Sequence, residues 1–338
     1  MMDAVLENRR LSRWAALLPR GCNQRGAIHE SDAELLPLGD GRLLALTVDQ
    51  VVEEVAIGLY RQPQTVGRIA ATAALSDLAA VGADVLGLLI SVTMPPKDQE
   101  SVQQAVAAGI RDVTTRAQTH VIGGDTSEGT ALAIACTAAG TVPEKQVLTR
   151  LGASPGDTVF TTGPLGLGAA LAAVHLFDLP QAMLAEQDFR PAVRIAEGKA
   201  LRTLASCCMD SSDGLIATLD QLARLNDVAI VIDEEPATLL HPRAAQVRAA
   251  LGIEATPFLA AIHGEFELVF AISPSRLSPF QEVVGSMGLS PQRIGAVSKG
   301  HGVHLGNRRL DTASIRNLSC ETGDDAGRYL ERLVELCR

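Results

Sequence analysis

The sequence predicts an α+β protein built from two domains. The chain has 338 residues, more than one hydrophobic core normally serves. Apolar residues make up 47% of it and aromatic residues only 3%, a composition typical of helices packed closely on sheets. Strand-like and helix-like segments follow one another within each half, which predicts sheets with helices on one face.

The first half is expected to contain five strands and two helices. Residues 35–57 read as two strands joined by a Gly-Asp-Gly turn, which is a hairpin signal. Residues 64–82 form an Ala-rich pattern that ends at a glycine, as helices often do. After the strand pattern of 84–96, apolar residues recur at helical spacing in 98–118. Two strands around the insert "HVIGGDTSEG" at 120–129 are expected to close this half.

The segment 148–157, "LTRLGASPGD", is rich in Gly, Pro and polar residues and predicts a boundary between domains 1–148 and 149–338. The second half opens with a strand, a glycine-rich turn and a helix. The turn lacks both GxGxxG and GxxxxGK[ST], so neither the dinucleotide nor the P-loop fingerprint applies. Further strands are expected at 229–234, 266–272, 293–298 and 302–306, and helices at 193–206, 214–225, 242–251 and 275–287.

Charge and composition exclude several classes of partner. The net charge is −10, and no basic run extends beyond Arg9-Arg10 and Arg308-Arg309, so nucleic acid is not an expected partner. No apolar stretch reaches the roughly eighteen residues of a membrane span. Residues 1–19 carry charges throughout and read as an amphipathic surface helix rather than a signal peptide. The six cysteines lack CxxC spacing and predict free thiols in a cytoplasmic protein.

Aspartates in short stretches next to small residues are the most informative polar feature. Magnesium prefers oxygen ligands and usually binds carboxylates together with substrate phosphates, so such acids could share ions around a polyphosphate. Asp is also common in turns and helix caps, and Asp213 before "GLIATLDQL" fits a cap equally well. Asp77 lies within an Ala-rich helix pattern, where Asp is a poor helix former. The candidates are Asp32, Asp49, Asp77, Asp125, Asp210 and Asp213.

Four motifs in order resemble those of the thiamine-monophosphate kinase family: "ALSDLAAVGA", "GGDTS", "MDSSDGL" and "HGEFELVF". That family is part of a superfamily with aminoimidazole-ribotide synthetase, selenophosphate synthetase and a hydrogenase maturation protein. The likeness runs from about Glu30 to Val303. It implies a PurM-like fold, in which an N-terminal α/β domain pairs with its twin to form a dimeric β-barrel. A C-terminal α+β domain would complete a groove for ATP.

The resemblance also implies the site residues, with ATP and Mg²⁺ as cofactors and a small-molecule phosphate as acceptor. The acceptor oxygen would already be ionised, so transfer needs charge neutralisation and alignment more than a general base. Arg150 would stabilise charge on the transferred group, and Asp213 would share the catalytic role. The implied metal ligands are Asp32, Thr47, Asp49, Asp77, Asp125, Asp210 and Asp213. The implied nucleotide contacts are Thr47, Gly124, Asp125, Arg150 and Ser212, and Glu265 would contact the substrate.

The chain departs from the family pattern mainly where the acceptor is recognised. Ser31 replaces one of two paired acids, and Ala56 stands where the family has a substrate-contacting His. The motif at 264–268 is shorter by one residue, and the closing aromatic segment is absent. Two alternatives therefore stay open. One is a related enzyme that activates another small molecule through an acyl- or imidyl-phosphate, and the other is a non-catalytic nucleotide-binding dimer.

Overall fold

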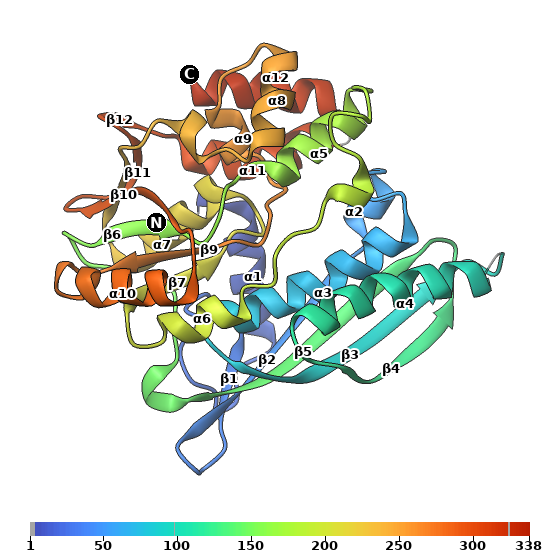
Figure 1. Ribbon diagram of the computed structural model, residues 1–338, viewed down its shortest axis with the longest axis horizontal. Helices are drawn as coiled ribbons and strands as arrows, with labels where there is room; N and C mark the ends of the chain where they lie inside the picture. The colour runs from blue at the N-terminus through green and yellow to red at the C-terminus, as the bar shows by residue number, and fades with distance from the viewer. Residues whose placement is uncertain (1–3, 98, 324) are drawn as a thin grey trace.

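The computed structural model describes residues 4–97, 99–323 and 325–338, and it contains two sheets with helices packed against them (Figure 1). The first sheet has the strand order β1-β2-β5-β3-β4, and the second has the order β12-β11-β8-β10-β6-β9-β7. This arrangement confirms the predicted α+β class. The strands of the first sheet are β1 (Glu34–Pro37), β2 (Arg42–Val51), β3 (Asp84–Met94), β4 (Val121–Glu128) and β5 (Ala133–Pro143).

The strands of the second sheet and the helices are numbered in the order in which they occur along the chain. Its strands are β6 (Thr158–Thr161), β7 (Ala205–Asp210), β8 (Ala229–Ile232), β9 (Leu268–Ile272), β10 (Gln292–Ser298), β11 (Gly302–Leu305) and β12 (Arg308–Arg309). The helices are α1 (Leu6–Leu17), α2 (Glu53–Ala56), α3 (Pro63–Ala80), α4 (Gln99–Arg116), α5 (Leu167–Leu176), α6 (Ile195–Leu201), α7 (Leu215–Asn226), α8 (Pro242–Leu251), α9 (Thr256–Ala260), α10 (Leu277–Met287), α11 (Thr312–Thr322) and α12 (Ala326–Cys337).

The predicted hairpin is present, but its second strand is shorter than expected. β1 and β2 pair antiparallel across the glycine turn, and β2 ends at Val51. The expectation that this strand continues to residue 57 is wrong, because residues 53–56 form helix α2. Glu53 and Glu54 lie in its first turn, where negative charge is favoured by the helix dipole.

Helices α3 and α4 lie side by side over one face of the first sheet (Figure 1). The close approach depends on Gly67 and Gly109. A Cβ at Gly67 would overlap the Val106 carbonyl, and a Cβ at Gly109 would overlap the Gln64 carbonyl. Most residues of α3 are buried because the helix also contacts α6 and β7 of the second half. This position brings the last turn of α3, with Asp77, to the junction of the two halves.

The opposite face of the first sheet carries exposed apolar side chains, which we call the open sheet face: Val48, Leu86, Leu89 and Ile122. They are 64%, 49%, 45% and 52% exposed. Val48 and Leu89 lie in one register row across β5, on the face away from α3. Large apolar residues gathered in this way mark a surface suited to contact with another molecule.

In the second half, residues 205–210 form strand β7 rather than the end of the helix expected at 193–206. Helix α6 stops at Leu201, and the run "ASCCMD" pairs antiparallel with β9. Cys207 and Cys208 are buried there. Pairing with a neighbouring strand therefore overrides the local helical pattern. Asp210 ends this strand and so comes close to α3.

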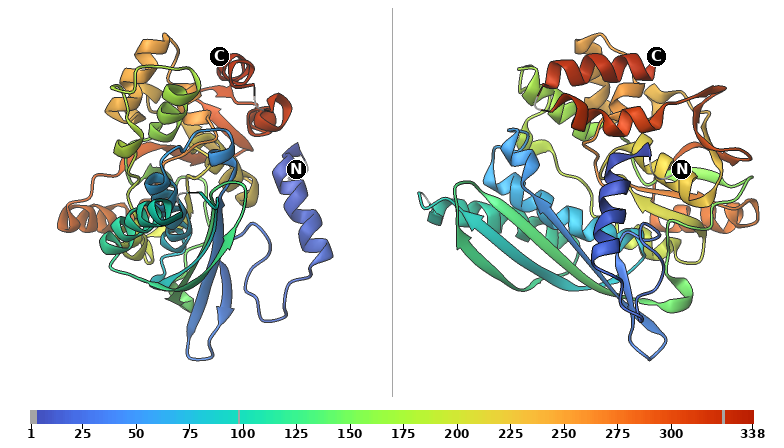
Figure 2. Two further views of the ribbon diagram at one scale, coloured as in Figure 1. Left: turned by 90° about the vertical axis from the view of Figure 1, so that its right-hand side faces the viewer. Right: turned by 180° about the vertical axis from the view of Figure 1, so that it is seen from behind.

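The predicted N-terminal helix is α1, which runs past the first sheet with its N-terminal end beside α11 (Figure 2). The Asn317 side-chain oxygen accepts from the Leu6 backbone N–H at 2.8 Å, and Asn8 donates to Gln221 at 3.1 Å. The six cysteines are free. Within the described ranges, no helix is long and apolar enough to cross a membrane. The predicted boundary at 148/149 falls between β5 and β6 and stays a prediction.

Candidate active site

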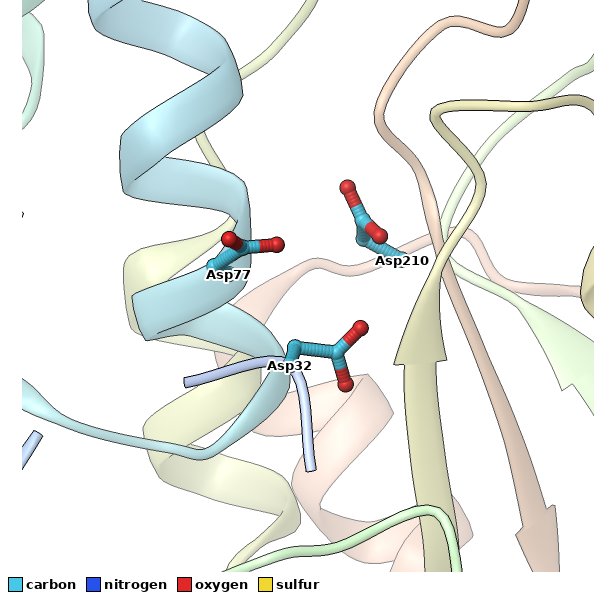
Figure 3. A group of neighbouring side chains, drawn as sticks. All are labelled: Asp32, Asp77 and Asp210. Carbon is cyan, nitrogen blue, oxygen red and sulfur yellow. The ribbon is translucent and has the colours of Figure 1, made fainter. Parts of the chain in front are cut away.

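Three carboxylates from distant parts of the chain converge where the two halves meet (Figure 3). Asp32 precedes β1, Asp77 lies in the last turn of α3, and Asp210 ends β7. Each offers an oxygen atom, and these atoms all lie within 4.8 Å of one another. The Ser76 hydroxyl donates to Asp210 at 2.6 Å and fixes the orientation of that carboxyl group.

Strand β2 adds Thr47 and Asp49 to this cluster. Residues two apart on a strand share a face, so both side chains point toward α3. The Thr47 hydroxyl donates a short hydrogen bond to Asp77. Asp49 lies next to Asp77 and lines the same cleft. The position of Asp77 is therefore set by its own helix, α3, and by the hydrogen bond from Thr47 of β2.

The loop after β7 contributes Ser212 and Asp213 to the cleft. Asp213 is not a helix cap, because the residue before α7 is Gly214 and no side chain caps that end. Gly214 has a φ of +81°, which favours glycine. Gly264 packs against the loop so closely that a Cβ there would overlap the Ser211 carbonyl. The loop conformation thus depends on glycines at two places.

Arg150 supplies positive charge beside the acids. Its Nη2 and Nε atoms donate to one oxygen of Asp32 at 2.8 Å and 3.2 Å. Asn226 donates to the Arg150 carbonyl at 2.8 Å and holds the backbone in place. Burial opposes the charge on Arg150, but the carboxylates of Asp32, Asp210 and Asp77 outweigh this effect and raise its pKa.

The carboxyl groups of the cluster are hard to ionise together. Burial and the charge of Asp32 raise the pKa of Asp210 to about 8. Burial and the charges of Asp49 and Asp210 raise the pKa of Asp77 well above its ordinary value. Desolvation within the cleft, with a smaller contribution from the charge of Glu7, raises the pKa of Asp213 to about 6, although part of this residue is exposed to solvent. Close like charges in a low-dielectric site produce such shifts.

This donor set fits a hard divalent cation. One oxygen each of Asp32 and Asp49 is buried and has no hydrogen-bond partner. Buried polar atoms of this kind are normally satisfied, so these oxygens are free to serve as ligands. Carboxylate oxygens at close spacing are the ligands that Mg²⁺ prefers, and a cation would relieve the mutual repulsion of Asp77 and Asp210.

The acids line a cleft of about 350 Å³ between the first sheet and the second half of the chain. This volume lies in the usual range for small-molecule sites. The cleft wall also contains His263 and Phe266 of the motif "HGEFELVF", and residues that no sequence motif singled out, among them Glu7, Tyr60 and Arg316. Arg316 donates to Asp220 at 3.0 Å and to Glu7 at 3.1 Å, which ties α1 to α7 and α11. Only tertiary contacts bring Glu7, Tyr60 and Arg316 to the cleft, so no local signal marked these three residues.

Gly124 and Asp125 lie apart from the cluster. The expectation that residues 120–129 form an insert between two strands is wrong, because β4 runs without interruption from Val121 to Glu128. Asp125 of β4 and Gln50 of β2 lie in one row of paired residues that runs across the sheet. Strands β3 and β5 lie between them, so the two residues are three strand spacings, or about 14 Å, apart. The row of Gln50 faces away from α3, opposite to Asp49. The nucleotide and metal roles of Gly124 and Asp125 therefore stay predictions.

Glu265 is buried beneath the cleft rather than on its wall. Its carboxyl group accepts from the Gly168 N–H at 3.4 Å, at the N-terminus of α5. Burial raises the pKa of Glu265 to about 8, although hydrogen bonds from this helix end favour the charged form. Phe266, which follows it with a φ of +60°, lines the cleft instead. Substrate contact by Glu265 stays a prediction.

The fold and the carboxylate cluster define a protein of the AIR synthase-related, PurM-like class. Residues 30–142 match the family described as "AIR synthase related protein, N-terminal domain". The matched segment holds the first four candidate acids and most of the first sheet. Among curated proteins, a thiamine-monophosphate kinase of Halobacterium salinarum is 32% identical over 267 residues, which is 78% of this chain and 88% of that protein. The chain belongs to the thiamine-monophosphate kinase family.

Other relatives and solved structures agree with this assignment. A thiamine-monophosphate kinase of Pyrococcus horikoshii is 32% identical over 278 residues, 81% of this chain and 84% of that protein. A thiamine-monophosphate kinase structure from Stenotrophomonas maltophilia has a TM-score of 0.69 at 27% identity and covers 90% of this chain and 98% of its own. A structure described as "AaThiL complexed with AMPPCP and TMP" has a TM-score of 0.76 at 23% identity, covers 92% and 96%, and shows the shared fold.

Proposed function

We propose that the protein is an ATP-dependent kinase that transfers the γ-phosphoryl group to the phosphate of a small-molecule acceptor, with thiamine monophosphate as the first candidate. The observation that carries this proposal is the convergence of Asp32, Asp77 and Asp210 beside Arg150 in one cleft. Relatives at about 30% identity are named thiamine-monophosphate kinases. A related fold is described in complex with AMPPCP and TMP.

We also propose that Mg²⁺ is the cation of this site. Asp32, Asp77 and Asp210 would hold it, with Asp49 and Thr47 next to them. A bound divalent ion supplies neutralisation of phosphate charge, which lets two anions approach each other. Ser212 and Asp213 would complete the wall around the phosphates.

The side chains of this protein would bind and align the reactants rather than form a covalent intermediate. The acceptor phosphate is already ionised at neutral pH, so no proton has to leave the attacking oxygen. Arg150, held by Asp32, would stabilise the negative charge on the transferred group. The short Thr47–Asp77 hydrogen bond would keep the carboxylate in a fixed orientation.

The test combines binding and turnover. Isothermal titration with a non-hydrolysable ATP analogue and Mg²⁺ measures binding, and a coupled assay with thiamine monophosphate measures ADP release. Asp77→Asn should remove both, since an amide is a poorer Mg²⁺ ligand than a carboxylate. Asp178→Asn is the matched control, because Asp178 is exposed and its φ of +50° suits Asn. Absence of metal-dependent ATP binding would contradict the proposal, and binding without ADP release would favour a non-catalytic nucleotide-binding protein.

We further propose a homodimer formed through the open sheet face. A dimeric β-barrel would bury Val48, Leu86, Leu89 and Ile122, which are all more than 40% exposed in one chain. It would also bring Asp125, on the same face, to the interface. Val48→Glu should shift the mass measured by light scattering from dimer to monomer, whereas a monomeric wild type would contradict this arrangement.

The six free thiols fit a reducing compartment, so we propose a cytoplasmic location. The acidic net charge of −10 supports a small-molecule acceptor rather than a nucleic acid.

A further inference from the structure

A second cavity, of about 490 Å³, lies between α2, α5, α9, α11 and α12. In Figure 1, α5 lies between α2 and the group of helices at the C-terminal end. The cavity wall is mostly apolar and includes Ile57, Ala172, Phe177, Phe258 and Leu330. A cavity of this size and lining is typical of sites for small organic molecules.

This apolar cavity adjoins the carboxylate cleft. Ile262 and His263 line both spaces. The next residue, Gly264, lines the cleft and donates its N–H to the Ser212 carbonyl at 2.9 Å. A molecule with its phosphate among the carboxylates would reach the apolar cavity by extending its organic part past Ile262.

The polar groups of the cavity are few and mainly uncharged. Among the described residues that line it, Glu53 is the only acidic side chain, and it is exposed at the rim. Burial lowers the pKa of His263 to about 4, so its imidazole is neutral at pH 7. The Tyr329 hydroxyl is buried beside the Ile262 backbone, but no hydrogen bond of ordinary geometry joins them.

We propose that this cavity binds the organic group of the phosphate acceptor and favours an uncharged, largely apolar group over a cationic ring. The proposal rests on the proposed kinase function and specifies its acceptor. Removing a permanent cation from water without a buried counter-ion is unfavourable, whereas apolar atoms gain from burial in the same space. A hydrogen-bond acceptor on the group would satisfy the Tyr329 hydroxyl.

The first test compares two acceptors of the same shape. One is thiamine monophosphate, and the other is its analogue in which carbon replaces the charged ring nitrogen. We expect a KM about tenfold lower for the neutral analogue with similar kcat, because only the neutral ring avoids the desolvation penalty. An equal or lower KM for thiamine monophosphate would overturn the proposal. If neither compound is phosphorylated, the proposed function fails, and the affinities of the two compounds measured by titration still decide the preference.

The second test narrows the cavity. Ala172→Phe, on α5, should raise the KM of the neutral acceptor at least about tenfold and leave the affinity for the ATP analogue unchanged, because the added ring occupies the cavity. Ala250→Phe, on an exposed position of α8, is the matched control and should change neither quantity. Thermal unfolding verifies that both variants fold.

Tyr329→Phe keeps the cavity volume and removes only the hydroxyl, so it covers the case in which Ala172→Phe fails to fold. It should raise the acceptor KM several-fold if the bound group accepts a hydrogen bond there. An unchanged acceptor KM in every folded cavity variant, or an equal loss of ATP affinity, would place the acceptor elsewhere.

Discussion

Replacing Asp210 by Asn should change how the stability of the metal-free protein depends on pH. The pKa of Asp210 is raised from 3.8 to about 8 in the folded protein, so between these values the folded state holds one proton more than the unfolded state. Its contribution to stability is full below pH 3.8 and is lost as the pH rises toward 8. The loss is on the order of 1 kcal/mol per pH unit, or roughly 3 kcal/mol between pH 5 and pH 7.

The Asn side chain does not titrate and can still accept from Ser76, which donates to Asp210 at 2.6 Å. The stability of Asp210→Asn relative to wild type should therefore rise by roughly 3 kcal/mol from pH 5 to pH 7. Urea unfolding in EDTA at several pH values measures the difference. Parallel profiles within about 0.5 kcal/mol, as for the Asp178→Asn control, would refute the reasoning.

Three further predictions concern residues around the cluster. Arg150→Lys should lower kcat about a hundredfold with little change in fold, because Lys cannot make the paired contacts to Asp32 at 2.8 Å and 3.2 Å. Steady-state kinetics measures kcat, and thermal unfolding verifies the fold. A kcat within threefold of wild type would count against this prediction. Gly264→Ala should destabilise the loop after β7, because a Cβ there overlaps the Ser211 carbonyl. It should therefore weaken Mg²⁺–ATP binding, which titration measures. Unchanged affinity would show that the loop adjusts freely. Glu265→Gln should leave the acceptor KM nearly unchanged. It should also gain stability relative to wild type as the pH rises from 4.5 to about 8, because over this range the unfolded wild type ionises Glu265 while the folded protein keeps it protonated; a large rise in KM would instead support substrate contact.

The elements with a clear local pattern were predictable from the sequence. The hairpin of β1 and β2 follows from its glycine turn, and α3 and α4 follow from their helical spacing. Helix α2 and strand β7 were not predictable in this way. Their conformations depend on a short acidic turn and on pairing with β9, and neither leaves a periodic signal in a short segment.

The site was predictable in its residue types more than in its geometry. Carboxylates in short stretches next to small residues indicated Asp32, Asp77 and Asp210, and the structure brings these side chains together. Asp125 showed the same local pattern, yet it lies in β4 on the other face of the sheet. A strand and a turn are hard to distinguish in a stretch such as "GGDTSE", which holds only polar and small residues. A shift by one position also reverses the face of every side chain in a strand.

The most direct measurement of the central claim is a crystal structure with Mn²⁺ in place of Mg²⁺ and a non-hydrolysable ATP analogue, with the ion located by anomalous scattering. We expect the ion at about 2.2 Å from oxygens of Asp32, Asp77 and Asp210, with the nucleotide phosphates as further ligands. An ion and triphosphate bound elsewhere, with these three carboxylates still free or protonated, would contradict the account.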